Sequence, residues 1–209
     1  MNTIDNLILN FDQALKTLIP GSVHAKRANP AHACPETDLD DSEKKHTAGL
    51  MRINHTGEVC AQALYQGQAL TAKLPEVRSS MQDAADEEID HLSWCEERLN
   101  ELDSKPSLLN PLWYGLSFGI GAAAGLAGDR WSLGFVAETE KQVCIHLQEH
   151  LSEISSDDDK SQAILTQMVE DENLHALNAE AAGAAELPVP IKTAMSLMAS
   201  VMKQTTYHI

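Results

Sequence analysis

Three glutamate–histidine pairs have the spacing that metal-binding helices use, because each histidine follows its glutamate by three residues: Glu43–His46, Glu88–His91 and Glu172–His175. Residues three apart on a helix point to the same side, so one pair can bind one metal ion through a carboxylate and an imidazole. Three copies prove little in a chain with 31 acidic residues and nine histidines. The sequence around each pair distinguishes those that occupy core positions from the one that does not.

The second and third pairs occupy positions where a helical pattern predicts core residues. Apolar residues at helical spacing run through 81–102 and 165–182, and each run encloses one pair. Burying an unpaired carboxylate costs several kcal/mol, so these pairs predict a positive partner in the core. The Glu43–His46 pair lies in the charged run DDSEKKH, which has no apolar register, and we interpret it as solvated.

A single inward-facing glutamate precedes each of these two pairs by one helix. Glu58 lies 30 residues before Glu88, and Glu140 lies 32 residues before Glu172, both in helical stripes. The chain therefore repeats one unit, a helix with one glutamate followed by a helix with Glu-x-x-His. Two such hairpins packed together would bring six ligands to the centre of a helical bundle. The candidate ligands are Glu58, Glu88, His91, Glu140, Glu172 and His175.

Each candidate ligand has an ordinary structural explanation when it is considered alone. A glutamate in a helical stripe is often a boundary residue with its carboxylate in water, and a core histidine is often bound to a carbonyl. Six such residues in matched order and at near-equal spacing favour a metal site. Oxygen-rich ligands with one imidazole for each metal suit iron or manganese better than zinc or copper.

The elements that position these residues are expected to be helices. Alanine, leucine and glutamate are plentiful, and no stretch alternates as a strand does. The fold class predicted is all-α, a ferritin-like four-helix bundle with a hydrophobic crossover helix and extra terminal helices. A linker without periodicity is expected at about 21–46. The predicted helices lie at about 3–19, 47–73, 77–103, 109–126, 131–154, 160–184 and 188–205.

Charge and cysteine content narrow the possible functions. The formal net charge of −16 argues against nucleic acid as a partner, because phosphate groups bind to basic surfaces. The four cysteines form no CxxC pair and are interpreted as small buried side chains. The N-terminal residues lack the basic start and long apolar run of a secretory signal, so we expect a reducing, cytoplasmic location.

Several short motifs surround the candidate ligands. The first is RINHTGE, residues 52–58, followed by YQGQ at 65–68. The others are DEEIDHL at 86–92, NPLW at 110–113 with the glycine-rich stretch after it, and DENLH at 171–175. This set of motifs resembles that of the demethoxyubiquinone hydroxylases, the di-iron monooxygenases of ubiquinone biosynthesis, and the likeness covers about residues 47–205. It is specific, because ferritins and rubrerythrins share the metal pattern without NHxGE or the PLW segment.

The resemblance implies two iron ions per chain, held by the six candidate ligands, with Glu88 and Glu172 bridging both. Family members hydroxylate the ring of a polyprenylated demethoxyubiquinol with dioxygen and two electrons. Ala176 stands where the family often has a second histidine. We accordingly expect an N-terminal amphipathic helix plus linker at 1–46 and a ferritin-like di-iron hydroxylase domain at 47–209. No GxGxxG run follows a strand pattern, so electrons must come from a partner, a freely bound reductant or the reduced substrate.

An uncharged stretch runs from Pro106 to Gly128 and is long enough to cross a bilayer. A crossing would leave the two ligand-bearing hairpins on opposite sides of the membrane, so the site could not assemble. We therefore expect a crossover helix on one leaflet, with Trp113, Tyr114 and Trp131 near the interface. The alternative is a crossover buried in a soluble bundle or dimer. A peripheral protein on the cytoplasmic face of the inner membrane is the location expected.

Two further matters stay open at this point. A ferritin-like or rubrerythrin-like iron or peroxide-handling protein would share the six ligands, and a homo-oligomer or a complex of ubiquinone biosynthesis is compatible with the sequence.

A metal-bound histidine is usually oriented by a carboxylate on its other ring nitrogen. Acidic residues directly precede both inward glutamates, and a neighbouring helix is within their reach. We predict that Asp171 bonds His91 and that Glu87 bonds His175.

Overall fold

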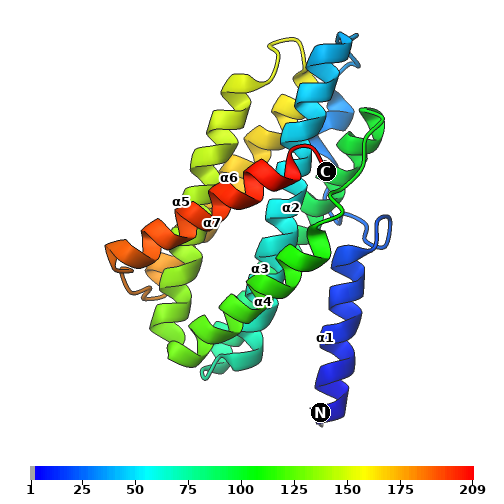
Figure 1. Cartoon of the computed structure of the whole chain (residues 1–209). Coiled ribbons are helices and arrows are strands. Elements are labelled where there is room, and N and C mark those ends of the chain that lie inside the picture. The colour runs from blue at the N-terminus through cyan, green and yellow to red at the C-terminus, as the bar shows by residue number, and fades with distance from the viewer. Residues whose placement is uncertain (1–2) are drawn as a thin grey trace.

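The structure is a computed structural model that describes residues 3–209, with side chains described from residue 8 onward (Figure 1). Within these residues the chain forms helices and no strand, which confirms the all-α prediction. The short 3₁₀-helix η1 spans Pro30–Ala33. The α-helices are α1 (Thr3–Leu18), α2 (Asp41–Thr71), α3 (Pro75–Glu101), α4 (Asn110–Ala127), α5 (Asp129–Glu153), α6 (Asp159–Ala181) and α7 (Val189–Thr206).

Four of these helices, α2, α3, α5 and α6, form the bundle. α2 packs along α3 and α5 packs along α6, so the chain makes two hairpins, which meet through α3 with α6 and α2 with α5. α4 crosses the bundle obliquely from the loop after α3 to the start of α5 (Figure 1). The predicted bundle with a hydrophobic crossover helix and extra terminal helices is confirmed.

Two apolar clusters fill the bundle, and each draws side chains from all four helices. One contains Met51, Trp94, Leu99, Leu147 and Met168. The other contains Ala61, Tyr65, Met81, Val136 and Ala179. On every helix the predicted ligands fall between the residues of the first cluster and those of the second. The apolar clusters therefore cover both ends of the layer in which the ligands lie.

Glycines allow α4 to lie unusually close to α2. A Cβ atom on Gly67 of α2 would collide with the carbonyl oxygen of Phe118, and a Cβ atom on Gly121 of α4 would collide with the carbonyl oxygen of Leu64. Both obstacles are backbone atoms, which cannot swing aside as a side chain can. The glycines of the apolar stretch therefore serve helix-to-helix packing.

The α2 helix begins at Asp41, so the expected start at Thr47 is wrong. Asp40 caps the helix by accepting hydrogen bonds from the backbone of Ser42 and Glu43, and the Glu43 carboxylate accepts one from the Asp40 backbone. This capping box makes a helix of a charged run that shows no apolar periodicity. Glu43 is thus bound to the Asp40 backbone, whereas His46 Nδ1 lies 2.6 Å from the Tyr207 hydroxyl oxygen. The Glu43 and His46 side chains therefore have different partners and do not meet at one point.

The crossover helix buries one face on α2 and leaves the other in solvent. Trp113 and Tyr114 lie on the buried face, where Trp113 packs with Ile53 and Tyr114 donates a hydrogen bond to Gln66. Of the three rings expected near a membrane interface, Trp113 and Tyr114 are thus packed against the protein, whereas Trp131 is exposed. No helix among residues 3–209 is both long enough and apolar enough to span a bilayer.

Candidate metal centre

The six predicted ligands are all buried and come from the four bundle helices. Each is 8 % exposed or less, and Glu88 and His91 are wholly buried. Carboxylate and imidazole atoms of Glu58, Glu88, His91 and Glu172 lie within 4.8 Å of one another. The helical spacing predicted from the sequence therefore does bring side chains of separate hairpins to one point.

His91 points one ring nitrogen into this group. Its Nδ1 atom lies 3.0 Å from Glu88, 3.1 Å from Glu172 and 3.8 Å from Glu58. The contact with Glu88 comes from the same helix, and that with Glu172 comes from α6 across the bundle. An imidazole nitrogen surrounded by carboxylates from three helices is the arrangement expected for a histidine that binds a metal ion together with carboxylates.

His175 repeats this arrangement from the opposite hairpin. Its Nδ1 atom lies 3.1 Å from Glu172 on its own helix and 3.2 Å from Glu88 on α3. Glu88 and Glu172 are thus the two carboxylates that both imidazoles face. This shared position is what a bridging carboxylate requires.

Glu140 completes the layer and is held by a residue that sequence reasoning did not assign to the site. The Tyr65 hydroxyl group donates a hydrogen bond to Oε1 of Glu140. Burial, with Glu172 and Glu88 nearby, raises the pKa of Glu140 well above its usual value. Tyr65 lies about two helical turns after Glu58 and so shares its face of α2, but the partner of its hydroxyl group could not be inferred from one sequence.

Electrostatics makes the layer a poor place for carboxylates without a cation. Burial raises the pKa of Glu58, and the charges of Glu88 and Glu172 raise it further. Burial would lower the pKa of His175, but its hydrogen bonds to Glu172 and Glu88 prevail and raise it to about 12. In the absence of metal, protons on the imidazoles therefore occupy the place that cations would take.

The donor set fits a pair of divalent metal ions. Four glutamates supply four negative charges, which two divalent cations would balance with both imidazoles neutral. Oε2 of Glu88 lies 3.0 Å from His91 Nδ1 and Oε1 lies 3.2 Å from His175 Nδ1, so the two oxygens of this buried carboxylate each face one histidine. Oxygen ligands with one imidazole for each ion suit iron.

A second ring of carboxylates holds the outer nitrogen of each histidine. His91 Nε2 lies 2.9 Å from Asp171 Oδ2, and His175 Nε2 lies 2.7 Å from Glu87 Oε2. Both predicted pairings are confirmed. Hydrogen bonding on Nε2 leaves Nδ1 as the metal-facing nitrogen of each ring.

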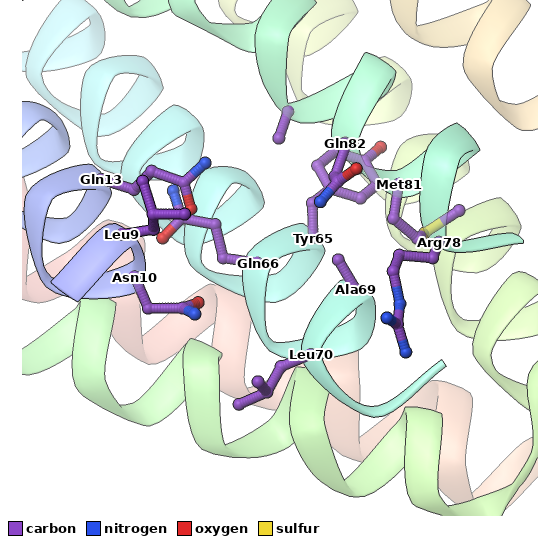
Figure 2. Close-up of a pocket in the computed structure, with 11 residues that line it drawn as sticks. Leu9, Asn10, Gln13, Tyr65, Gln66, Ala69, Leu70, Arg78, Met81 and Gln82 are labelled. Atoms are coloured by element: carbon purple, nitrogen blue, oxygen red, sulfur yellow. The ribbon is translucent and has the colours of Figure 1, made fainter. Parts of the chain in front are cut away.

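Three cavities approach the ligand layer. One, of about 290 Å³, lies between α1, α2 and α3, and Tyr65 forms part of its wall together with Gln66 and Met81 (Figure 2). A second, lined by Glu87 and His175, lies between α3, α5 and α6. The third is narrow and largely apolar, and is enclosed by α2, α4, α5 and α7.

Comparison with known proteins identifies the family of this chain. The sequence model of the family described as Ubiquinone biosynthesis protein COQ7 matches residues 45–206. This chain belongs to that family. A relative from Ectopseudomonas mendocina, named 3-demethoxyubiquinol 3-hydroxylase, is 63 % identical over 99 % of this chain and 96 % of its own length. Relatives with the same name from Pseudomonas aeruginosa and Azotobacter vinelandii are each 61 % identical, over 99 % and 98 % of this chain and 96 % and 95 % of theirs.

The fold is similar to that of a solved thioferritin, a bacterioferritin-related protein from Bacteroides fragilis. That structure matches 68 % of this chain and 84 % of its own, with a TM-score of 0.56 and 19 % sequence identity. The likeness shows the ferritin-like fold alone. All six candidate ligands fall within the segment that the COQ7 family match covers, whereas α1 and the linker precede it.

Proposed function

We propose that this protein is a di-iron monooxygenase that uses dioxygen to hydroxylate the ring of a polyprenylated demethoxyubiquinol in ubiquinone biosynthesis. The observation that carries the proposal is the buried layer of four glutamates and two histidines, found in a chain 63 % identical to a 3-demethoxyubiquinol 3-hydroxylase. The ferritin-like alternative, an iron or peroxide-handling protein, has only the shared fold in its favour.

The six side chains would hold two iron ions. His91 with Glu58 would bind one ion, and His175 with Glu140 would bind the other, because each histidine lies on the helix that pairs with the helix of its glutamate. Glu88 and Glu172 would bridge, since both imidazoles face them.

When bound, the iron pair supplies the redox chemistry that activates dioxygen. The protein contributes rigid ligand positions and the exclusion of water. Both apolar clusters are packed against the ligand layer, and such a covering strengthens electrostatic interactions inside it. Electrons would come from a partner protein, a freely bound reductant or the reduced substrate.

The apolar cavity enclosed by α2, α4, α5 and α7 is the place we assign to the substrate ring. Thr139 on its wall directly precedes Glu140 in the chain, so the cavity adjoins the ligand layer. Buried atoms of two wall residues, Trp113 Nε1 and Thr139 Oγ1, have no hydrogen-bond partner among the described residues. They could bind the oxygen atoms of a quinol, whose remaining surface is apolar.

Methionines of α7 form one wall of this cavity: Met195, Met198 and Met202. The cavity holds only about 90 Å³, so these side chains must shift to admit a ring. Methionine is unbranched and adapts its shape readily. Half of the residues of α7 are exposed and only Met202 and Thr206 are buried, which leaves room for that movement.

A membrane-dissolved substrate requires a membrane-facing surface, and we propose that α4 and its neighbours provide it on the cytoplasmic face of the inner membrane. Large apolar side chains are exposed on α4 at Leu112, Leu116 and Leu126. Further large apolar side chains are exposed on α1 and α7, among them Phe11 and Leu197. Such patches favour peripheral attachment of helices that lie on a bilayer.

The proposal is tested by metal analysis and by oxygen incorporation. The purified protein should hold two iron ions per chain and, with a reductant, should transfer one atom of labelled dioxygen to the ring of a demethoxyubiquinol, seen by mass spectrometry. Glu172→Ala removes a bridging carboxylate, so it should lower iron content and abolish the product.

Glu43→Ala is the matched control, because Glu43 belongs to the first Glu-x-x-His pair, which lies outside the ligand layer, and its carboxylate takes part in the cap of α2. It should leave iron content and product unchanged. Wild-type product formation by Glu172→Ala would refute the proposal. Oxidation of ferrous iron without any labelled quinol would instead support the ferritin-like alternative.

A further inference from the structure

Arg27, in the linker between α1 and α2, reaches the outer side of the ligand layer. Its Nε atom donates to Asp90 Oδ2 at 2.7 Å, and its Nη2 atom lies 2.8 Å from Asp171 Oδ2. The guanidinium lies over the Trp94 ring, 4.9 Å from the ring centroid. Arg27 thus joins α3 to α6 beside His91, although the linker precedes the segment matched by the family.

The linker also supplies the hydrogen-bond donors of a buried carboxylate. Asp90 is 3 % exposed and directly precedes His91. One of its oxygens accepts the backbone N–H of Lys26 at 2.6 Å, and the other accepts from Arg27. A buried carboxylate without such donors is costly, so the pairing fixes the linker at this point.

Asp171 connects Arg27 to the predicted metal ligand. Its Oδ2 atom accepts from both Arg27 Nη2 and His91 Nε2, at 2.8 Å and 2.9 Å. The guanidinium can only donate, so it keeps this oxygen in place as the acceptor for His91. The His91 ring is thereby held with Nδ1 toward Glu88 and Glu172.

Among the residues whose side chains the structure describes, no arginine or lysine supports the equivalent carboxylate on the other hairpin. His175 is held by Glu87, whose side chain is 58 % exposed, whereas the Asp171 side chain that holds His91 is 16 % exposed. The cavity lined by Glu87 and His175 is also open to solvent on that side. The two halves of the ligand layer are alike in their ligands but differ in how firmly the histidines are oriented.

We propose that Arg27 is a positioning residue that fixes Asp171 and, through it, His91, so that the metal position at His91 is tighter than the one at His175. The inference rests on the metal centre assigned under the proposed function. Removing a residue that supports a metal ligand commonly lowers metal affinity 10- to 100-fold. Loss of Arg27 should therefore weaken the tighter of two binding steps and leave the other nearly unchanged.

An anaerobic calorimetric titration of the full-length, metal-free protein with ferrous iron measures the affinity of both iron-binding steps. In the wild type we expect two ions per chain with unequal affinities. Arg27→Gln should weaken the tighter step about 10-fold or more. Glu87→Gln should weaken the other step. Arg27→Lys keeps the charge but cannot reach both carboxylates with one ammonium group, so it should behave as Arg27→Gln does.

Lys26→Gln is the matched control. Its side chain pairs only with the exposed Asp86, and its backbone bond to Asp90 remains, so both steps should keep wild-type affinity. Melting of the metal-free variants shows whether the bundle has been damaged. The inference would be overturned if Arg27→Gln kept both wild-type iron affinities, or if Arg27→Lys did. Equal weakening of both binding steps together with a lower melting temperature would overturn it too. A wild-type protein that binds no iron pair would overturn the metal centre as well.

Discussion

The hydroxyl group of Tyr65 on α2 donates a hydrogen bond to the carboxylate of Glu140 on α5. Both residues are buried, at 2 % and 1 % exposure, and they belong to different hairpins of the bundle. Burial and the nearby charge of Glu140 raise the pKa of Tyr65 well above its usual value, so the phenol keeps its proton and remains a donor. The bond connects the hairpins within the ligand layer.

Tyr65→Phe should keep the fold and weaken iron binding. The variant removes only the hydroxyl group, which leaves Glu140 without its donor and free to rotate. We expect affinity for ferrous iron to fall about 10-fold, measured by titration of the metal-free protein. Tyr114→Phe is the control, because the Tyr114 hydroxyl donates to Gln66 instead of a ligand. Equal iron affinity in both variants would contradict the role given to Tyr65.

Stability should fall as the pH falls below about 6.5, because two buried histidines of α5 are held neutral. Burial lowers the pKa of His146 to about 4 and that of His150 to about 3, and the charge of Lys203 contributes to both. His46 lowers the pKa of His150 as well, and His150 Nδ1 lies 2.7 Å from Asn54 Oδ1. Unfolding restores ordinary pKa values, so the unfolded chain binds protons that the folded chain does not.

Each histidine should therefore cost about 1–2 kcal/mol of unfolding free energy between pH 6.5 and pH 5. Chemical denaturation at several pH values measures this slope. His150→Gln keeps a side-chain amide that can donate to Asn54 and removes one titrating group, so its slope should be shallower. A slope unchanged in both His150→Gln and His146→Gln would show that other groups carry the pH dependence.

Gly121→Ala should destabilise the protein, because its new methyl group would meet the backbone of Leu64. Overpacking of this kind costs about 1–3 kcal/mol. Gly119→Ala on the same helix is the control, since no atom lies within 4 Å of the added Cβ there. Alanine at that position should raise stability by about 0.5–1 kcal/mol. Urea denaturation compares the two, and equal stabilities would mean that α4 does not depend on close packing against α2.

Membrane attachment should depend on the exposed face of α4. Leu112→Glu together with Leu116→Glu should move the protein from the membrane fraction to the supernatant, because both side chains are exposed, at 64 % and 45 %. Leu177→Glu on α6 is the control, since its side chain is 54 % exposed but lies outside that face. Flotation with vesicles measures the distribution. Wild-type protein that stays in the supernatant would contradict the proposed location.

The bundle and its ligand layer were predictable because they depend on helical periodicity. Glu88 and His91 interrupt an apolar stripe, which is a local signal that one sequence contains. The pairing of Asp171 with His91 was also predictable, because a residue beside an inward glutamate is directed toward the next helix. These features follow from the geometry of regular helices.

Other features depend on contacts that periodicity does not encode. Arg27 lies in a linker without a repeating pattern, and its partners Asp90 and Asp171 are distant in sequence. The burial of Trp113 follows from how closely α4 approaches α2, which the glycines allow but do not specify. Long-range placement of irregular segments therefore had to come from the structure.

The division of the ligands between two hairpins has a consequence for biosynthesis of the enzyme. Glu58, Glu88 and His91 leave the ribosome well before Glu172 and His175, and α4 must fold back before the hairpins can meet. Before α6 is synthesised, the first hairpin therefore carries two carboxylates without the ligands that the second hairpin supplies. Binding of both iron ions must therefore follow translation of α6, and until then the nascent chain depends on protons or on solvent to limit the repulsion between Glu58 and Glu88.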